Sequence, residues 1–164
     1  MIRDCLAVAL AILVLSGCGG PPRAARVAVA QTAGGLLIAD SIVAEAVRSR
    51  GESSRAQVLS EVQRGELSSA ADALDRWEAL MQPTSAARDG LRSARAALRA
   101  VEAAVDAWEA GTGSERGFSA AAGCAVGAIS HAIEAMREAG LEVPSVVLSG
   151  LALVQGFAGA CHAP

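Results

Sequence analysis

Residues 91–108 read LRSARAALRAVEAAVDAW, and this stretch decides the fold class. Apolar residues recur in it at alternating steps of three and four, which is the spacing of one face of an α-helix. They are Leu91, Ala94, Leu98, Val101, Val105 and Trp108. Arginines and acids of the same stretch fall on the other faces. The pattern therefore predicts an amphipathic helix over residues 85–110 that packs its apolar face against other helices.

Composition extends this prediction to the rest of the chain. Ala is abundant and is the best helix former. Tyr is absent, and Phe and Trp number two each. The core must therefore be built from Ala, Leu, Val and Ile, and side chains this small fill a core only where helices approach closely. We predict an all-α fold, an antiparallel bundle of four to five helices.

Local signals divide the predicted bundle into helices. Gly51-Glu52-Ser53 predicts a break, and a capping box at residues 54–57 predicts a restart. Pro83 predicts the end of the second helix, because proline cannot donate the next helical hydrogen bond. A second capping box at residues 112–115 opens the fourth helix, and Gly140 follows its end. The predicted helices cover about residues 23–50, 54–82, 85–110, 115–139 and 144–160.

The first eighteen residues have the order of an export signal: Arg3, then an apolar run, then small residues before a cysteine. The stretch Leu15-Ser16-Gly17-Cys18 resembles the lipobox of bacterial lipoproteins. That resemblance implies cleavage before Cys18 and acylation of Cys18, for example with palmitate, so that the lipid bilayer becomes a partner of the chain.

The same resemblance divides the chain into a signal peptide (1–17), a lipidated tether (18–22) and a helical domain (23–164). Gly19 stands where Asp is associated with retention in the inner membrane. The resemblance therefore implies the outer membrane, with the domain facing the periplasm. An ordinary signal peptide or an uncleaved anchor is the alternative interpretation of these residues.

Two cysteines remain for the domain, Cys124 and Cys161, and we predict a disulfide between them. The turn between the last two predicted helices centres on residues 142–143, so folding the hairpin there brings both cysteines level. The bond would close a loop of about 37 residues, worth about 3–4 kcal/mol in the chain-entropy model. A metal site with His131 and His162 is the alternative, but Cys124 and His131 lie about 10 Å apart along one helix. We therefore expect no metal and no cofactor.

Charge and motifs narrow the function. The net charge of −3 supplies no basic face for nucleic acid. The sequence contains no nucleophile elbow, no His-Glu-x-x-His and no phosphate loop. We therefore expect a non-catalytic scaffold or binding module of the cell envelope that meets an envelope protein partner, rather than an enzyme.

Two features leave other functions open. The stretches 117–133 and 144–161 carry no charged residue. A membrane-active protein of the phage lysis or exclusion type, which inserts this hairpin into the bilayer, is therefore the alternative function. Four arginines also recur on the helix over 85–110, and we interpret them as a solvated face, with a surface for anionic lipid or polymer as the functional alternative. They are Arg88, Arg92, Arg95 and Arg99.

Overall fold

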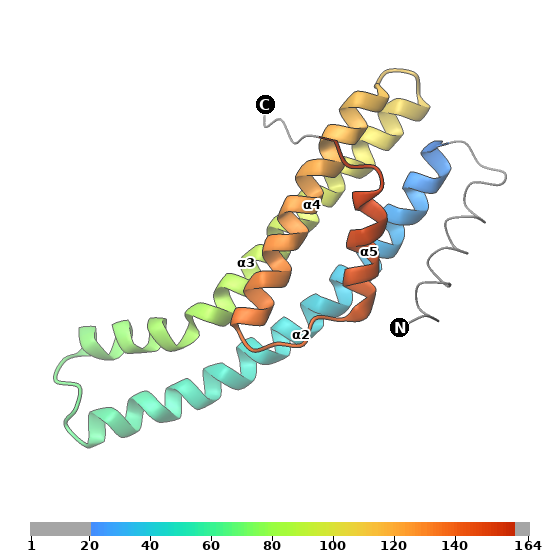
Figure 1. Ribbon diagram of the computed structural model, residues 1–164. Helices are drawn as coiled ribbons and strands as arrows, with labels where there is room; N and C mark the ends of the chain where they lie inside the picture. Colours follow the sequence, from blue (N-terminus) through green and yellow to red (C-terminus); the bar gives the residue numbers. More distant parts are fainter. Residues whose placement is uncertain (1–20, 160–164) are drawn as a thin grey trace.

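The computed structural model describes residues 21–159, and within that range it consists of four helices without a strand (Figure 1). They are α2 (Pro21–Gln63), α3 (Ala70–Glu109), α4 (Glu115–Glu138) and α5 (Ser145–Gln155). The prediction of an all-α chain is confirmed. α2 begins at Pro21, inside the segment predicted to be the tether.

The predicted break at Gly51-Glu52-Ser53 is wrong, because α2 runs through it without interruption. Ser54, expected to cap a new helix, is buried in the middle of α2. A Cβ built on Gly51 would lie 3.9 Å from Trp77 Cη2 and 4.0 Å from Met81 Cε, both on α3. Packing against α3 therefore outweighs the weak helix preference of Gly51.

The chain reverses at residues 64–69 instead. Gly65 takes a φ of 72°, a conformation that suits glycine because it lacks a Cβ. Ser69 then caps α3 in a complete capping box, in which its side chain accepts from the Asp72 amide while the Asp72 side chain accepts from the Ser69 amide. These polar turn residues, not the glycine at 51, separate the first two helices.

The predicted helix end at Pro83 is also wrong, since Pro83 lies inside α3. The helix predicted over 54–82 is divided between two observed helices. Residues 54–63 form the end of α2, and residues 70–82 continue into the helix predicted over 85–110 to form α3. A proline removes one backbone donor and favours a bend without forcing the helix to stop. Thr84 and Ala87, just beyond it, are buried, so packing holds the helix together across this position.

Helix ends in the second half of the chain follow the sequence more closely. Ser114, rather than Thr112, caps α4 by accepting from the Gly117 amide at 3.1 Å. Gly140 has a φ of 73° and follows α4 as predicted. α5 begins after Pro144 as predicted but ends at Gln155, short of the expected residue 160.

Each of the four helices packs against two of the others. α3 contacts α2 and α4, and α5 contacts α2 and α4. We call this part, residues 23–50 and 85–159, the body. Its core holds the largest fully buried side chains, which include Leu36, Val43, Leu91, Ile129, Met136 and Val147.

α2 and α3 continue beyond the other two helices. Figure 1 shows them extending together past the ends of α4 and α5 to the turn that joins them. We call this hairpin, residues 51–84, the arm. α3 changes direction between the arm and the body (Figure 1), consistent with a proline inside that helix.

Candidate functional site

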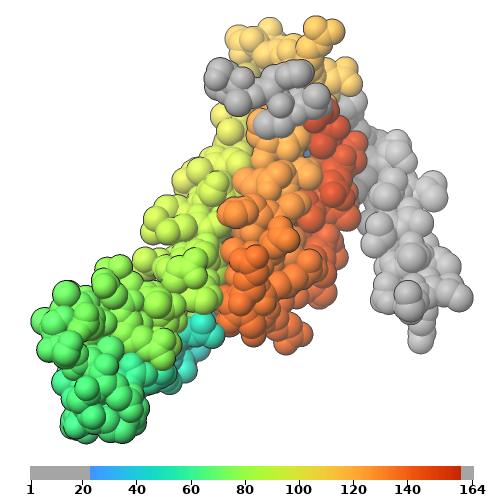
Figure 2. Space-filling model, turned by 60° about the vertical axis from the view of Figure 1, so that its left-hand side comes forward, coloured from blue at the N-terminus to red at the C-terminus, as the bar shows by residue number. Residues whose placement is uncertain are grey.

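The arm is the feature that distinguishes this molecule from a simple helical domain. Figure 2 shows it standing clear of α4 and α5 in the space-filling view. Few of its residues are buried: Ser54, Val58, Glu61 and Thr84. Two helices alone cannot enclose a core, so the arm keeps apolar side chains in solvent.

Three large apolar side chains of the arm are exposed. Leu74 is 62% exposed, Leu59 is 52% exposed and Val62 is 44% exposed. Leu59 and Val62 lie three residues apart on α2, and Leu74 lies on the facing part of α3. Leu59 and Val62, one turn apart on the same helix, are the pair on the arm from which a contact surface could be built.

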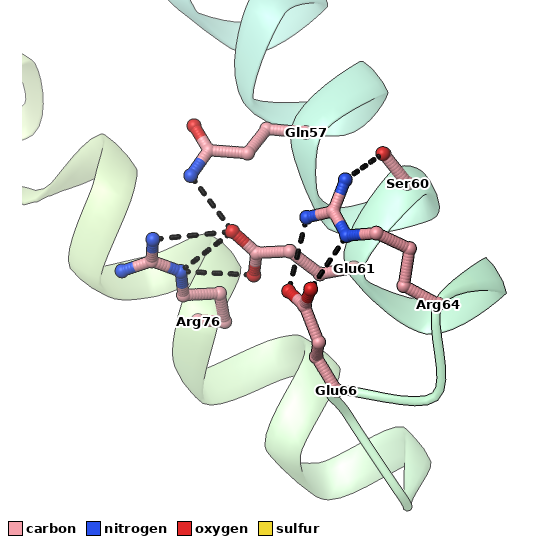
Figure 3. Close-up of polar contacts among 6 residues, drawn as sticks. All are labelled: Gln57, Ser60, Glu61, Arg64, Glu66 and Arg76. Atoms are coloured by element: carbon pink, nitrogen blue, oxygen red, sulfur yellow. Dashed lines mark hydrogen bonds and ion pairs between the residues drawn. The ribbon is translucent and has the colours of Figure 1, made fainter.

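A polar cluster closes the tip of the arm (Figure 3). Arg76 on α3 donates from Nε to Glu61 Oε2 at 3.1 Å and from Nη2 to Glu61 Oε1 at 3.2 Å. Gln57 Nε2 donates to the same Glu61 Oε1 at 2.8 Å. Next to this pair, the Arg64 guanidinium contacts both carboxylate oxygens of Glu66.

Glu61 is the central group of this cluster. Only 8% of the residue is exposed, so its charge depends on the surrounding donors. Hydrogen bonds from Arg76, and then from Gln57, lower the pKa of Glu61, against a smaller opposing effect of desolvation. Its carboxylate is therefore ionised at neutral pH and ties the end of α2 to the start of α3. This cluster joins α2 and α3 across the tip of the arm.

The opposite end of the molecule is also closed by ion pairs. Arg26, in the second turn of α2, contacts Asp106 at 2.7 Å and the Glu109 carboxylate near the end of α3. The hydrogen bond from Arg26 lowers the pKa of Glu109. α2 and α3 are thus fixed to each other near both ends.

The residues predicted for lipidation and for the disulfide lie only partly in the described range. Cys18 and Cys161 are outside the described residues, as is His162. Cys124 lies on α4 and is half-buried. Phe157 packs on Phe118 with ring centroids 5.6 Å apart, and the Gly159 amide donates to Ser119 O at 2.9 Å. The chain just before Cys161 therefore lies on the first turns of α4, and the bond stays a prediction.

The remaining predicted features carry no clear chemistry in this structure. His131 is exposed on α4. Across residues 21–159, no group of three His, Cys, Asp or Glu side chains is arranged to hold a metal ion.

Comparison with protein-family models, with curated proteins and with solved structures finds no match to this chain.

Sequence reasoning missed the Glu61–Arg76 pair. The two residues lie fifteen positions apart, and they meet only because the chain reverses between them. The available signal was the polar turn around Gly65 together with the Ser69-x-x-Asp72 capping box. Read as a hairpin turn, that segment would have placed Glu61 and Arg76 on facing helices.

Proposed function

We propose that this chain is a lipid-anchored, non-catalytic binding module of the bacterial envelope. In this proposal the body is an antiparallel four-helix bundle, Cys18 carries the lipid, and the arm presents its apolar side chains to an envelope protein. The anchor belongs to the outer membrane and the domain faces the periplasm. The arm, a helical hairpin that extends beyond α4 and α5 (Figure 1) and exposes apolar residues, carries the proposal.

The geometry of α2 supports this arrangement. The helix begins three residues after Cys18 and has 43 residues. At 1.5 Å per residue its length is about 65 Å. An acyl anchor beside its first turn places the tip of the arm at the far end of the same helix. The arm would therefore reach a partner well away from the bilayer surface.

The membrane-active alternative has less support. Arg23–Gln63 and Glu115–Glu138 are long and apolar enough to cross a membrane by length and composition, a test that a buried core helix also passes. α5, however, has 11 residues, or about 17 Å, against an apolar bilayer core of about 30 Å. It also buries Val147, Gly150 and Val154 within the body. A hairpin of α4 and α5 would have to leave these contacts before it could insert.

Two experiments test the proposal. The first compares membrane fractions of cells that express the wild-type chain or Cys18→Ser. Intact-mass analysis of both chains gives the result: we expect the wild type to lack residues 1–17 and to carry acyl groups, and Cys18→Ser to carry none. An unacylated wild-type chain would refute lipid anchoring at Cys18.

The second experiment places a photo-cross-linking amino acid in the arm at Leu74 or, as a control, in the body at Ala103, which is exposed on α3. We expect a discrete protein adduct in intact cells from position 74 and none from position 103. The additional substitution Leu59→Glu should weaken the adduct, because it places a charge on the other helix of the arm to which the partner is proposed to bind. Adducts from both positions, or from neither, would contradict a partner surface on the arm.

A further inference from the structure

A groove runs between α2 and α3 on the body, apart from the arm. Its volume is about 440 Å³, in the range of small-molecule sites. Along α2 it extends over residues 26–37, which corresponds to about 16 Å of helical rise. Residues of α2 and α3 line it, among them Val29, Ala30 and Leu36 on α2 and Arg95, Arg99 and Glu102 on α3.

The floor of the groove is apolar. Val29, Leu36, Leu98 and Val105 are all buried within the protein and also line the groove. Leu37 lies at the edge and is 65% exposed, the largest value among the exposed apolar side chains. An elongated apolar floor with an open side suits a flexible hydrocarbon chain, which gains from leaving water and needs no hydrogen bonds.

Two arginines on one wall offer donors for an acid. Arg95 and Arg99 lie one turn apart on α3. The Arg95 Nη2 atom is 2.6 Å from Asp40 Oδ2, but its Nε is buried and has no hydrogen-bond acceptor among the described residues. Arg99 forms no ion pair with any residue of the part that the structure describes. Arg99 is exposed and open to an acid in the groove, and the Arg95 side chain, which is 32% exposed, adds a second guanidinium one turn away.

Glu102 gives the groove a direction. It lies one turn beyond Arg99 on the same wall, towards Val105. Arg26 also lines the groove at that end, but its charge is paired with Asp106 and Glu109. The Glu102 carboxylate repels an acid there, so Arg95 and Arg99 form the attractive end. An acid bound there would direct its hydrocarbon chain past Glu102 towards Val29 and Val105.

We propose that this groove binds a single-chain anionic amphiphile, with its acid group at Arg95 and Arg99 and its acyl chain on the apolar floor. A fatty acid and a lysophospholipid share this chemistry, because one supplies a carboxylate and the other a phosphate. The groove does not involve the arm, so the proposal stands apart from the protein partner proposed for the arm.

The test uses the full chain, purified from membranes and placed in phosphatidylcholine nanodiscs. The probe is a 16-carbon fatty acid with a diazirine near its tail, and mass spectrometry locates the adducts after illumination. We expect adducts concentrated on the peptides that contain Val29 and Val105. A matched probe in which an alcohol replaces the acid should label these peptides about fivefold less, the effect of one exposed ion pair of about 1 kcal/mol.

Three variants separate the groove from general binding to the helices. Ala30→Phe narrows the groove from an exposed position and should abolish the localised adducts. Arg99→Gln should lower them about fivefold. Arg88→Gln removes an exposed arginine of the same helix outside the groove and should leave them unchanged. Circular dichroism of each variant verifies that the helices are retained.

Unlabelled competitors distinguish the two sources of the acid. Stronger competition by the 16-carbon fatty acid would assign a carboxylate ligand, and stronger competition by lysophosphatidylglycerol would assign a phosphate ligand; either outcome supports the site. The proposal is overturned if neither competes, if the acid and alcohol probes label equally, or if labelling in Ala30→Phe equals that of the wild type.

Discussion

Replacement of Gly150 by alanine tests whether α5 packs on α2 as the structure has it. A Cβ at position 150 would lie 2.8 Å from Thr32 Oγ1, 2.9 Å from Thr32 Cα and 3.1 Å from Thr32 Cβ. Thr32 cannot easily yield, because it is fully buried and its hydroxyl donates to Ala28 O at 2.7 Å. Alanine at position 150 must therefore push the two helix backbones apart.

The expected magnitude follows from two opposing effects. Alanine in a helix interior is about 1 kcal/mol more favourable than glycine. Overpacking of a well-packed contact costs about 1–3 kcal/mol. Gly127, in the middle of α4, is the matched control because a Cβ there would meet no atom within 4 Å. Both variants gain the same helix preference, so the difference between them isolates the contact between α2 and α5.

The assay is urea unfolding of the full chain in mild detergent, followed by circular dichroism. We expect Gly127→Ala to raise the free energy of unfolding by up to about 1 kcal/mol. We expect Gly150→Ala to be about 1–3 kcal/mol less stable than Gly127→Ala. If α5 instead lies in a bilayer away from α2, the alanine side chain at position 150 does not meet Thr32. Gly150→Ala and Gly127→Ala would then be equally stable. Equal stability would therefore refute this packing and favour the membrane-inserted hairpin.

Two further predictions concern the arm and the cysteines. The pKa of Glu61 is lowered in the folded state, so the ionised carboxylate stabilises the fold. This stabilisation is present at pH values above the ordinary pKa of 4.5, and it is lost as the pH falls through the lower pKa of the folded state. Hydrogen exchange should therefore show that the amides of the arm lose protection below that pH, with α4 as the internal reference. Glu61→Gln should reduce this loss. If protection of the arm has the same pH dependence in the variant as in the wild type, the role of Glu61 is contradicted. For the predicted disulfide, intact-mass analysis should show Cys124 and Cys161 alkylated only after reduction, and alkylation without reductant would exclude the bond.

The spacing of apolar residues predicted the helix over 91–108 correctly, because this spacing reflects which side chains are buried. The apolar residues of the stretch 91–108 form one face, and Leu91, Leu98, Val101 and Val105 are among the buried residues of the body. The caps around α4 were also largely predictable, since Gly140 and the polar residues before Glu115 act through local backbone geometry. These features depend on neighbours within a few residues, which the sequence displays directly.

Ion pairs between residues far apart in the sequence could not be predicted from local spacing. Glu61 with Arg76, Asp40 with Arg95 and Arg26 with Glu109 are joined by the way α2 and α3 run past each other. Their register depends on where the chain reverses, and moving that reversal from 51–53 to 64–69 changes every partner. The groove between α2 and α3 depends on the same register, and neither wall alone predicts it.

The two wrong helix breaks have a common physical origin. Gly51 on α2 faces Trp77 and Met81 of α3, since a Cβ built on it would lie 3.9 and 4.0 Å from them, and Pro83 follows two residues after Met81. Arg50, next to Gly51, donates from Nη2 to Ala139 O at 3.3 Å, so both positions lie near the level at which α4 ends. Glycine and proline weaken a helix most where few neighbouring helices support it, so their local effect is real even though neither ends a helix here. The same residues that imitate helix ends thus mark the junction between body and arm.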